Sequence, residues 1–203
     1  MGEKRKSEEE PELQEPEKIS RQEDQTCACA DSTQLDYNYV LKGYVADRQG
    51  EREDMQDAHV LMDDFLKYVP EVHKSIVRLA LYAVFDGHGG ARASRFACQH
   101  LHNNLRDRFP KGNIKHVEKE IKKIFIEAFK KTDDDFLKEA ARNKPSWKDG
   151  TTAVVVLAIN DTLYIANLGD SKVTNVDFTA TARGKLAKFE TTPRLCRRCE
   201  PVQ

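Results

Sequence analysis

Residues 77–90 read VRLALYAVFDGHGG. The first nine are almost continuously apolar, a pattern that predicts a strand buried on both faces. The glycine-rich residues 86–90 then end the strand and leave the Asp86 carboxylate at its mouth, while Gly87 lets the backbone turn and can expose its carbonyl. The sequence therefore predicts two oxygen donors of the kind that Mg²⁺ or Mn²⁺ prefers.

His88 adds an imidazole that can give up or take a proton near physiological pH, two residues from Asp86. A purely structural interpretation makes the same residues a strand-to-helix turn, because Asp and Gly are common turn residues. An isolated Asp-Gly pair favours the structural interpretation. The apolar strand ahead of it and the His-Gly-Gly behind it favour a functional one.

The remaining elements are predicted from alternating apolar positions for strands and from three- and four-residue spacing for helices. In chain order they are strands at 39–47, 57–62 and 77–85, a helix with an apolar stripe at Ala93, Phe96, Ala97, Leu101 and Leu105, a helix at about 117–141, a loop containing Trp147, and strands at 151–159 and 162–167. A tight turn at Asn160-Asp161 joins the last two strands. Strands and helices do not alternate, so the order predicts an α+β fold with helices on one side of antiparallel strands.

The two ends of the chain differ from this middle part. Residues 1–34 carry nine acidic residues between Glu3 and Asp24 and few apolar ones, which predicts a disordered acidic tail. Residues 177–203 carry six basic and three acidic residues and no convincing strand or helix period. We therefore expect one folded domain at 35–176, followed by a basic, disordered C-terminal tail at 177–203.

Composition excludes several classes of function. The 203 residues have a net charge of -1, which argues against nucleic acid or an anionic membrane as a partner. No apolar run reaches the roughly 18 residues that a membrane span needs, and the N-terminus lacks the apolar stretch of a signal peptide. We expect a cytoplasmic or nuclear protein; the basic run at 4–6 is too short to indicate the nucleus.

The five cysteines form an odd, sparse set that does not indicate a disulfide framework. Cys98 falls on the predicted face of a helix and is expected to be a small buried hydrophobe. The pairs Cys27/Cys29 and Cys196/Cys199 have the composition of a four-thiolate zinc site. Both pairs lie in segments with little sign of order, so we prefer the interpretation without a metal.

Four short motifs resemble those of type 2C metal-dependent protein serine/threonine phosphatases. They read GEREDMQDAH at 50–59, FDGHGG at 85–90, DGTTA at 149–153 and NLGDS at 167–171, in the family's order. The resemblance implies the N-terminal half of a two-sheet antiparallel β-sandwich flanked by helices. It also implies a centre of two Mg²⁺ or Mn²⁺ ions at one end of the sandwich.

The resemblance also assigns metal ligands. Asp86 would bridge the two ions, and Gly87 would add its carbonyl. Gln56 and Asp57 fall in the metal-binding part of the first motif, and Asp170 matches a residue that helps to bind a further ion. Without the resemblance, Asp57 and Asp170 would be interpreted as residues that cap or tighten turns.

The same resemblance assigns the catalytic residues and the partners. Arg52 would hold the substrate phosphate with its planar set of donors, and His88 would protonate the leaving serine or threonine oxygen. A metal-activated water would attack phosphorus, so no protein nucleophile is needed. The implied partners are phosphorylated protein substrates and a kinase-associated signalling complex.

The sequence also departs from the family pattern. Gln56 replaces a glutamate that binds metal in many members, and Lys172 replaces a common arginine. After Asp170 the acidic residues lack the Asp-Gly and Asp-Asn contexts of the family's remaining ligands; they are Asp177, Glu190 and Glu200. The sequence therefore resembles a C-terminally truncated or variant form, for which we expect weak metal binding, little turnover and an uncovered sheet face that favours association.

Two alternative functions remain open from the sequence. The first is a catalytically inactive interaction or regulatory module derived from the phosphatase. The second is a serine hydrolase, since Gly169-Asp170-Ser171 is similar to the nucleophile block of one esterase class and residues 88–90 to an oxyanion-hole turn. All six histidines precede Ser171 and no Gly-x-Ser-x-Gly is present, which disfavours the hydrolase.

Overall fold

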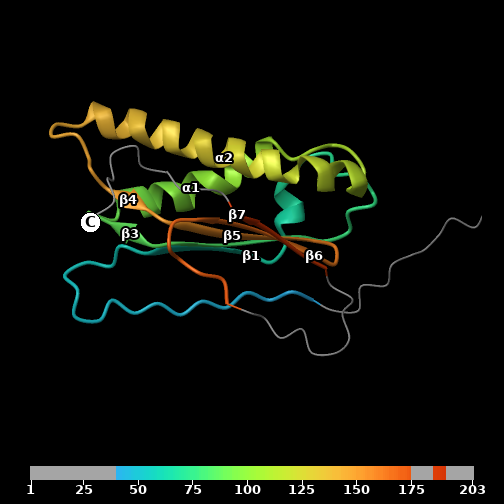
Figure 1. Ribbon diagram of the computed structural model, residues 1–203, viewed down its shortest axis with the longest axis horizontal. Helices are drawn as coiled ribbons and strands as arrows, with labels where there is room; N and C mark the ends of the chain where they lie inside the picture. Colours follow the sequence, from blue (N-terminus) through green and yellow to red (C-terminus); the bar gives the residue numbers. More distant parts are fainter. Residues whose placement is uncertain (1–39, 175–184, 191–203) are drawn as a thin grey trace, which may run out of the picture. The chain divides into compact units, whose positions relative to one another are not determined.

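The computed structural model describes residues 40–174 and the strand at 185–190, and its centre is a five-stranded sheet of order β1-β2-β5-β6-β7 (Figure 1). The elements are β1 (Ala58–Met62), the 3-10 helix η1 (Phe65–Tyr68), β2 (Leu79–Phe85), β3 (Gly87–His88), α1 (Arg92–Asp107), α2 (Ile114–Arg142), β4 (Gly150–Thr151), β5 (Ala153–Ile159), β6 (Thr162–Leu168) and β7 (Lys185–Glu190). Neighbours from β1 to β6 pair antiparallel, and β7 runs parallel to β6. The predicted α+β class is confirmed.

The core lies between this sheet and the two helices, which cover one of its faces (Figure 1). Side chains alternate along each strand, so one set of positions faces the helices. Leu81 and Phe85 of β2 and Leu157 of β5 belong to this set, and each is at most 1% exposed. They pack with the apolar stripe of α1 and with buried positions of α2 such as Phe125. Burial of this surface is the main stabilising term of the fold.

Both predicted helices are confirmed, and α2 begins three residues earlier than the apolar pattern indicates. The difference arises because Asn113 caps the helix, with its side chain accepting a hydrogen bond from His116 N (3.1 Å). Four of the five stripe positions of α1 are buried, and Phe96 is half-buried beside Phe136 of α2. Cys98 packs against the core but is only partly buried, which corrects the expectation of a buried side chain, and its thiol donates to the His59 carbonyl.

The strand predicted at 39–47 is wrong for the part that the structure describes, because residues 40–49 form neither strand nor helix. Among the described residues, no strand pairs with this segment; instead Gly43 N donates to the Asp63 carboxylate (2.7 Å). A Cβ on Gly43 would lie 2.5 Å from the Tyr82 ring, so the segment runs close against the sheet face opposite the helices. Val40 and Tyr44 point into solvent.

The prediction that residues 77–85 are buried on both faces is also wrong in part. Ala80 is fully buried, but Val77 and Val84 are each about half exposed. In the described part of the chain, helices cover one sheet face, and the segment ahead of β1 covers the other face incompletely. Exposed apolar side chains therefore remain on that face, as expected for half of a sandwich.

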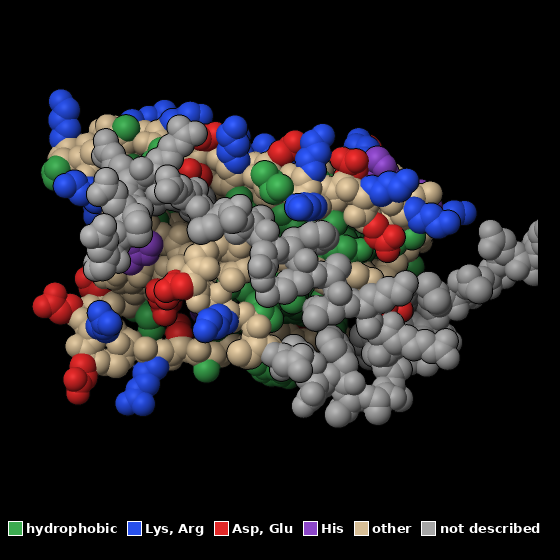
Figure 2. All heavy atoms as spheres, viewed as in Figure 1, with side chains coloured by type: hydrophobic (Ala, Val, Ile, Leu, Met, Phe, Trp, Pro, Cys, Tyr) green, Lys and Arg blue, Asp and Glu red, His purple; other side chains and the backbone are tan. Residues whose placement is uncertain are grey.

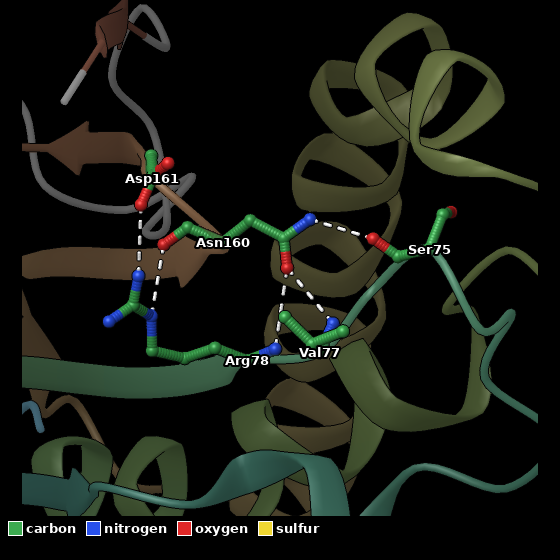
Figure 3. A network of polar contacts seen from close by, with 5 residues as sticks. All are labelled: Ser75, Val77, Arg78, Asn160 and Asp161. Carbon is green, nitrogen blue, oxygen red and sulfur yellow. Dashed lines mark hydrogen bonds and ion pairs between the residues drawn. The ribbon is translucent and has the colours of Figure 1, made fainter. Parts of the chain in front are cut away.

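The turn between β5 and β6 is confirmed and is tied to the start of β2 (Figure 3). Asn160 has a positive φ of 50°, which asparagine tolerates better than most residues. Its side-chain oxygen accepts from Val77 N (3.0 Å) and Arg78 N (3.3 Å), and its amide donates to the Ser75 carbonyl (2.8 Å). Arg78 in turn pairs with Asp161 (3.0 Å). This network fixes the end of the sheet opposite the candidate site.

The sequence after residue 177 carries no strand period, yet Lys185–Glu190 forms β7 beside β6. Pairing at a sheet edge uses backbone groups and does not require alternating side chains. The predicted acidic tail at 1–34 and the two paired cysteine motifs lie outside the described residues. The domain boundaries therefore stay predictions.

Within the described residues, no helix is long and apolar enough to cross a membrane.

Candidate functional site

A pocket of about 740 Å³ lies where the C-terminal end of β2 meets the turn ahead of β1. Its lining consists of Arg48, Gln49, Arg52, Glu53, Asp54, Met55, Gln56, Asp57, Asp86, Gly87, His88 and Gly89. Six of the seven predicted site residues are in this set, and Asp170 is not. Acidic and basic side chains stand side by side at this end of the molecule (Figure 2). The structure thus brings the first two motifs together.

Gly87 is the point at which these motifs touch. A Cβ at this position would lie 2.2 Å from the Gln56 carbonyl oxygen, so only glycine permits the approach. The buried Ser94 hydroxyl of α1 also donates to the Gln56 carbonyl, and to Ala91 O (3.1 Å). The sequence suggested that Gly87 serves the turn; the close approach of Gln56 is the stronger requirement.

Asp86 is held in place by the third motif. Its backbone N donates to Thr152 Oγ1 (3.3 Å), and its carbonyl accepts from Thr152 N (2.8 Å) and Thr151 Oγ1 (3.0 Å). Thr152 Oγ1 also shares a hydrogen bond with Ser171 Oγ (2.6 Å), which links the fourth motif. The two threonines were not predicted as site residues, although they belong to a recognised motif.

The carboxylates at this site repel one another. Partial burial raises the pKa of Asp86, and the charges of Asp57 and Asp170 raise it further, while His88 acts in the opposite direction. Asp170 is therefore close enough to act electrostatically on Asp86, although it does not line the pocket. A divalent cation would relieve this repulsion.

Two guanidinium groups line the same pocket, and only Arg52 was predicted. Neither Arg48 nor Arg52 has a carboxylate within salt-bridge distance among the described residues. Gln49 orders the backbone between them, because its amide donates to the carbonyls of Arg52 (2.7 Å) and Glu53 (2.9 Å). Two cationic groups on one wall give the pocket a place for an anion.

The donor set fits a metal in kind but not in number. Asp86, the Gly87 carbonyl, Gln56 and Asp57 supply the hard oxygen ligands that Mg²⁺ and Mn²⁺ prefer. Among the residues that the structure describes, however, no three acidic, histidine or cysteine side chains form a group able to hold an ion. Two adjacent dications need several anionic ligands to offset their repulsion, so these residues alone do not fit a complete two-ion centre.

The arrangement does not support the serine-hydrolase alternative. Ser171 Oγ bonds to another hydroxyl, that of Thr152, and the Ser171 carbonyl accepts from Asn167 Nδ2 (2.8 Å). A hydroxyl cannot serve as the general base that a serine nucleophile requires. His88 lies on β3 against Gly150 and lines the pocket with Asp86.

Comparison with known proteins identifies the family. The family model described as Protein phosphatase 2C matches residues 42–174, which is most of the part that the structure describes. The chain belongs to the protein phosphatase 2C family. The predicted type 2C fold, in its N-terminal half, is thereby confirmed together with the resemblance.

The chain is similar to named members of the protein phosphatase 2C family. It is 56% identical over 134 residues to the integrin-linked kinase-associated serine/threonine phosphatase 2C of Mus musculus, and 55% identical to that of Homo sapiens. Each match covers 66% of this chain and 34% of the relative. A probable protein phosphatase 2C 67 of Oryza sativa subsp. japonica is 39% identical over 127 residues, covering 63% of this chain and 33% of the relative.

The chain thus spans about a third of the length of these curated relatives. Sequence similarity to the integrin-linked kinase-associated member was visible in residues 41–53 and 85–96, and the comparison confirms it. Protein phosphatase 2C enzymes are generally metal-dependent, which agrees with the oxygen-rich pocket. The match ends at residue 174, just after the fourth motif.

Proposed function

We propose that this pocket serves Mg²⁺- or Mn²⁺-dependent hydrolysis of phosphoserine and phosphothreonine in proteins, and that the described residues alone give little turnover. One observation carries the proposal. Arg52 and Asp86 are 34 positions apart in the chain, yet both line a single pocket together with His88. A structural role for each motif would not require that their charged side chains share one cavity.

The protein groups divide into those that bind phosphate and those that handle the proton. Arg52 binds the phosphoryl oxygens of the substrate through its planar set of N–H donors, and Arg48 adds a second cation to the same wall. His88 donates a proton to the serine or threonine oxygen as it leaves phosphorus. Both roles use groups that line the pocket.

The metal ligands proposed from this chain are Asp86, the Gly87 carbonyl, Gln56 and Asp57, with Asp170 near them. A bound ion would supply an activated water and neutralise phosphoryl charge. Gln56 keeps an oxygen donor but carries no charge, unlike the glutamate of many family members. With so few anionic ligands in the described residues, we expect weak affinity for metal.

The second candidate is a phosphoprotein-binding module that does not hydrolyse its ligand. The lack of a three-ligand metal group among the described residues favours it. The cationic wall with Arg48 and Arg52 would still attract a phosphorylated segment. Because the most similar named relatives are integrin-linked kinase-associated phosphatases, we also propose a kinase-associated signalling complex, in the cytoplasm or the nucleus, as the setting.

The test is Mn²⁺-dependent hydrolysis of a phosphothreonine peptide by this chain, with Asp86→Ala and a chelator as controls. In parallel, fluorescence anisotropy measures binding of the same peptide, with its unphosphorylated form and Arg52→Ala as controls. We expect hydrolysis close to the Asp86→Ala background, together with binding that requires both the phosphate and Arg52.

The outcomes separate the two candidates. Hydrolysis that needs both metal and Asp86 would establish catalysis and refute the expected low turnover. Phosphate-dependent binding without hydrolysis would favour the binding module. Folded protein that neither binds nor hydrolyses the peptide would refute both.

A further inference from the structure

Asp149 is the most deeply buried carboxylate near the candidate site, and no role has been given to it above. Its side chain is 0% exposed and pairs with Arg92, whose Nη2 lies 2.7 Å from Oδ1. Oδ2 accepts from Arg92 Nε (2.8 Å) and from Arg92 N (3.0 Å). Burial by itself would raise the pKa of Asp149, but the bonds from Arg92 outweigh burial and lower it. The carboxylate is therefore held ionised.

This carboxylate also replaces the missing cap of α1. Ala91 occupies the N-cap position and has no side chain able to accept a hydrogen bond. The first free amide of the helix, Arg92 N, bonds instead to Asp149, which comes from the loop ahead of β4. A negative charge at a helix N-terminus is favourable because of the unpaired N–H groups there. Asp149 thus joins the start of α1 to β4.

Two glycines show how closely the contact between Asp149 and the start of α1 packs beside His88. Gly90 has a φ of 134°, and a Cβ there would lie 2.2 Å from Asp149 Oδ2. Gly150, the residue after Asp149, has the His88 imidazole in the place of a side chain, since a Cβ would lie 2.2 Å from His88 Nε2. The β3–β4 pairing sets His88 directly opposite Gly150. The Asp149 carboxylate therefore lies against Gly90, and the next residue in the chain, Gly150, lies against the His88 imidazole.

Arg92 is anchored on its other side by an aromatic ring. Its guanidinium lies over the Trp147 ring, 5.1 Å from the centroid, and Trp147 packs on Phe136 of α2. Cation–π contact and ion pairing together restrict the long arginine side chain. The chain of contacts runs from α2 through Trp147, Arg92 and Asp149 to the strand that supports His88.

We propose that Asp149 and Arg92 form a positioning pair that fixes the His88 imidazole over Gly150, at the pocket where the proposed function needs a proton donor. The role of His88 as a proton donor rests on the proposed function. The placement of its ring by Asp149 and Arg92 does not depend on turnover. Neither residue touches the pocket itself. Both act through the placement of β4 against β3.

The test uses the ring-current shift of the Gly150 Hα protons in the metal-free full chain, measured by NMR. Protons under an aromatic ring resonate away from their usual position, so this shift reports the placement of His88. We expect Asp149→Asn and Arg92→Gln each to move the Gly150 Hα resonances toward ordinary values. Arg92→Lys, which keeps the charge but loses the planar fork, is expected to restore part of the shift.

A double variant, Asp149→Asn with Arg92→Gln, should change the shift no more than either single variant, because the two groups act as one unit. The matched control is Arg78→Gln, which breaks the ion pair with Asp161 at the opposite end of the sheet. It should lower Tm and leave the Gly150 shift unchanged.

The proposal is refuted if folded Asp149→Asn protein keeps the wild-type Gly150 shift, or if Arg78→Gln moves it equally. Should Asp149→Asn fail to fold, Arg92→Gln decides, since an unchanged shift there also refutes the pair. Because no metal, substrate or turnover enters the measurement, a failure of the proposed phosphatase function would leave this result standing.

Discussion

At the scale of single residues, glycines allow the close approach of the four motifs, and hydroxyl groups join them by hydrogen bonds. Gly87 admits the Gln56 carbonyl, and Gly150 admits the His88 imidazole. The Thr152 hydroxyl then links the backbone of Asp86 to Ser171. These small groups decide where the charged side chains lie.

His102 of α1 gives a prediction for pH dependence. Burial lowers its pKa, the charges of Arg106 and His100 lower it further, and the bond to the Cys98 carbonyl acts in the opposite direction. As pH falls below 6.5, the ordinary pKa of histidine, the unfolded chain takes up a proton before the folded chain does, so the free energy of unfolding decreases.

We therefore expect Tm to fall less steeply between about pH 7 and about pH 5 in His102→Gln than in wild type. Thermal unfolding by circular dichroism at several pH values measures this slope. The control is His116→Gln, at an exposed position on α2, which should keep the wild-type slope. Identical slopes for His102→Gln and wild type would contradict the prediction.

At the scale of elements, α2 contributes to stability through the one face that packs in the core. Two adjacent residues, one on that face and one off it, test this. Phe125 is 0% exposed in the core, whereas Ile126 is 47% exposed. We expect Phe125→Ala to reduce the free energy of unfolding by about 3 to 5 kcal/mol, and Ile126→Ala by roughly 0.5 kcal/mol or less. Urea unfolding compares the two, and similar losses would show that the helix packs differently.

The β5–β6 turn carries a second element-scale prediction. Asn160→Gly keeps the freedom to adopt a positive φ and loses the side-chain bonds to Ser75, Val77 and Arg78. Asn160→Ala loses the same bonds and adds backbone strain, so it should cost about 1 kcal/mol more than the glycine variant. Equal stability of the two variants in denaturant titration would exclude strain at this turn.

The elements also show what sequence patterns can and cannot predict. Both helices and the strands β1, β2, β5 and β6 follow from apolar periodicity, because burial imposes that period. The segment at 40–49 has strand-forming residues but no ladder partner among the described residues, and a propensity cannot supply one. For β7 the reverse holds, since an edge strand can form by backbone pairing without a side-chain pattern.

The same limit applies to the site. Arg52, Gln56, Asp57 and Asp86 were predicted because they belong to recognisable motifs, and the structure gathers them in one pocket. Arg48 was missed because nothing in its neighbours marks it as different from a surface arginine. Asp149 was read as part of a motif, but its contacts with Arg92 and Gly90 depend on a loop that meets α1 only in three dimensions.

At the scale of the whole molecule, the described residues leave one sheet face incompletely covered and the β1 edge of the sheet without a neighbouring strand. Leu61 on this edge strand is 40% exposed. Edge strands with exposed apolar side chains favour association with other chains, and lysine at such positions opposes it. We expect wild type to associate with rising concentration in sedimentation velocity, and Leu61→Lys to do so less.

The control for this prediction is Val40→Lys, at a position 90% exposed outside the sheet. It adds the same charge without altering the edge, so its sedimentation should match wild type. If both lysine variants reduce association equally, net charge and not the sheet edge is responsible. A wild-type chain that stays monomeric at all concentrations would contradict the premise that the exposed sheet edge favours association.

The hydrogen bonds that hold Asp86 join residues 65 and 66 positions apart in the chain. Because a polypeptide emerges from the ribosome N-terminus first, Arg52, Gln56 and Asp86 are all synthesised long before Thr152 can meet them. Neither metal nor phosphate can therefore template the early steps of folding, since the place that would receive them does not yet exist. A ligand can bind only to chains in which β5 has already paired with β2. A binding assay on this protein therefore also measures the fraction of molecules that have finished folding.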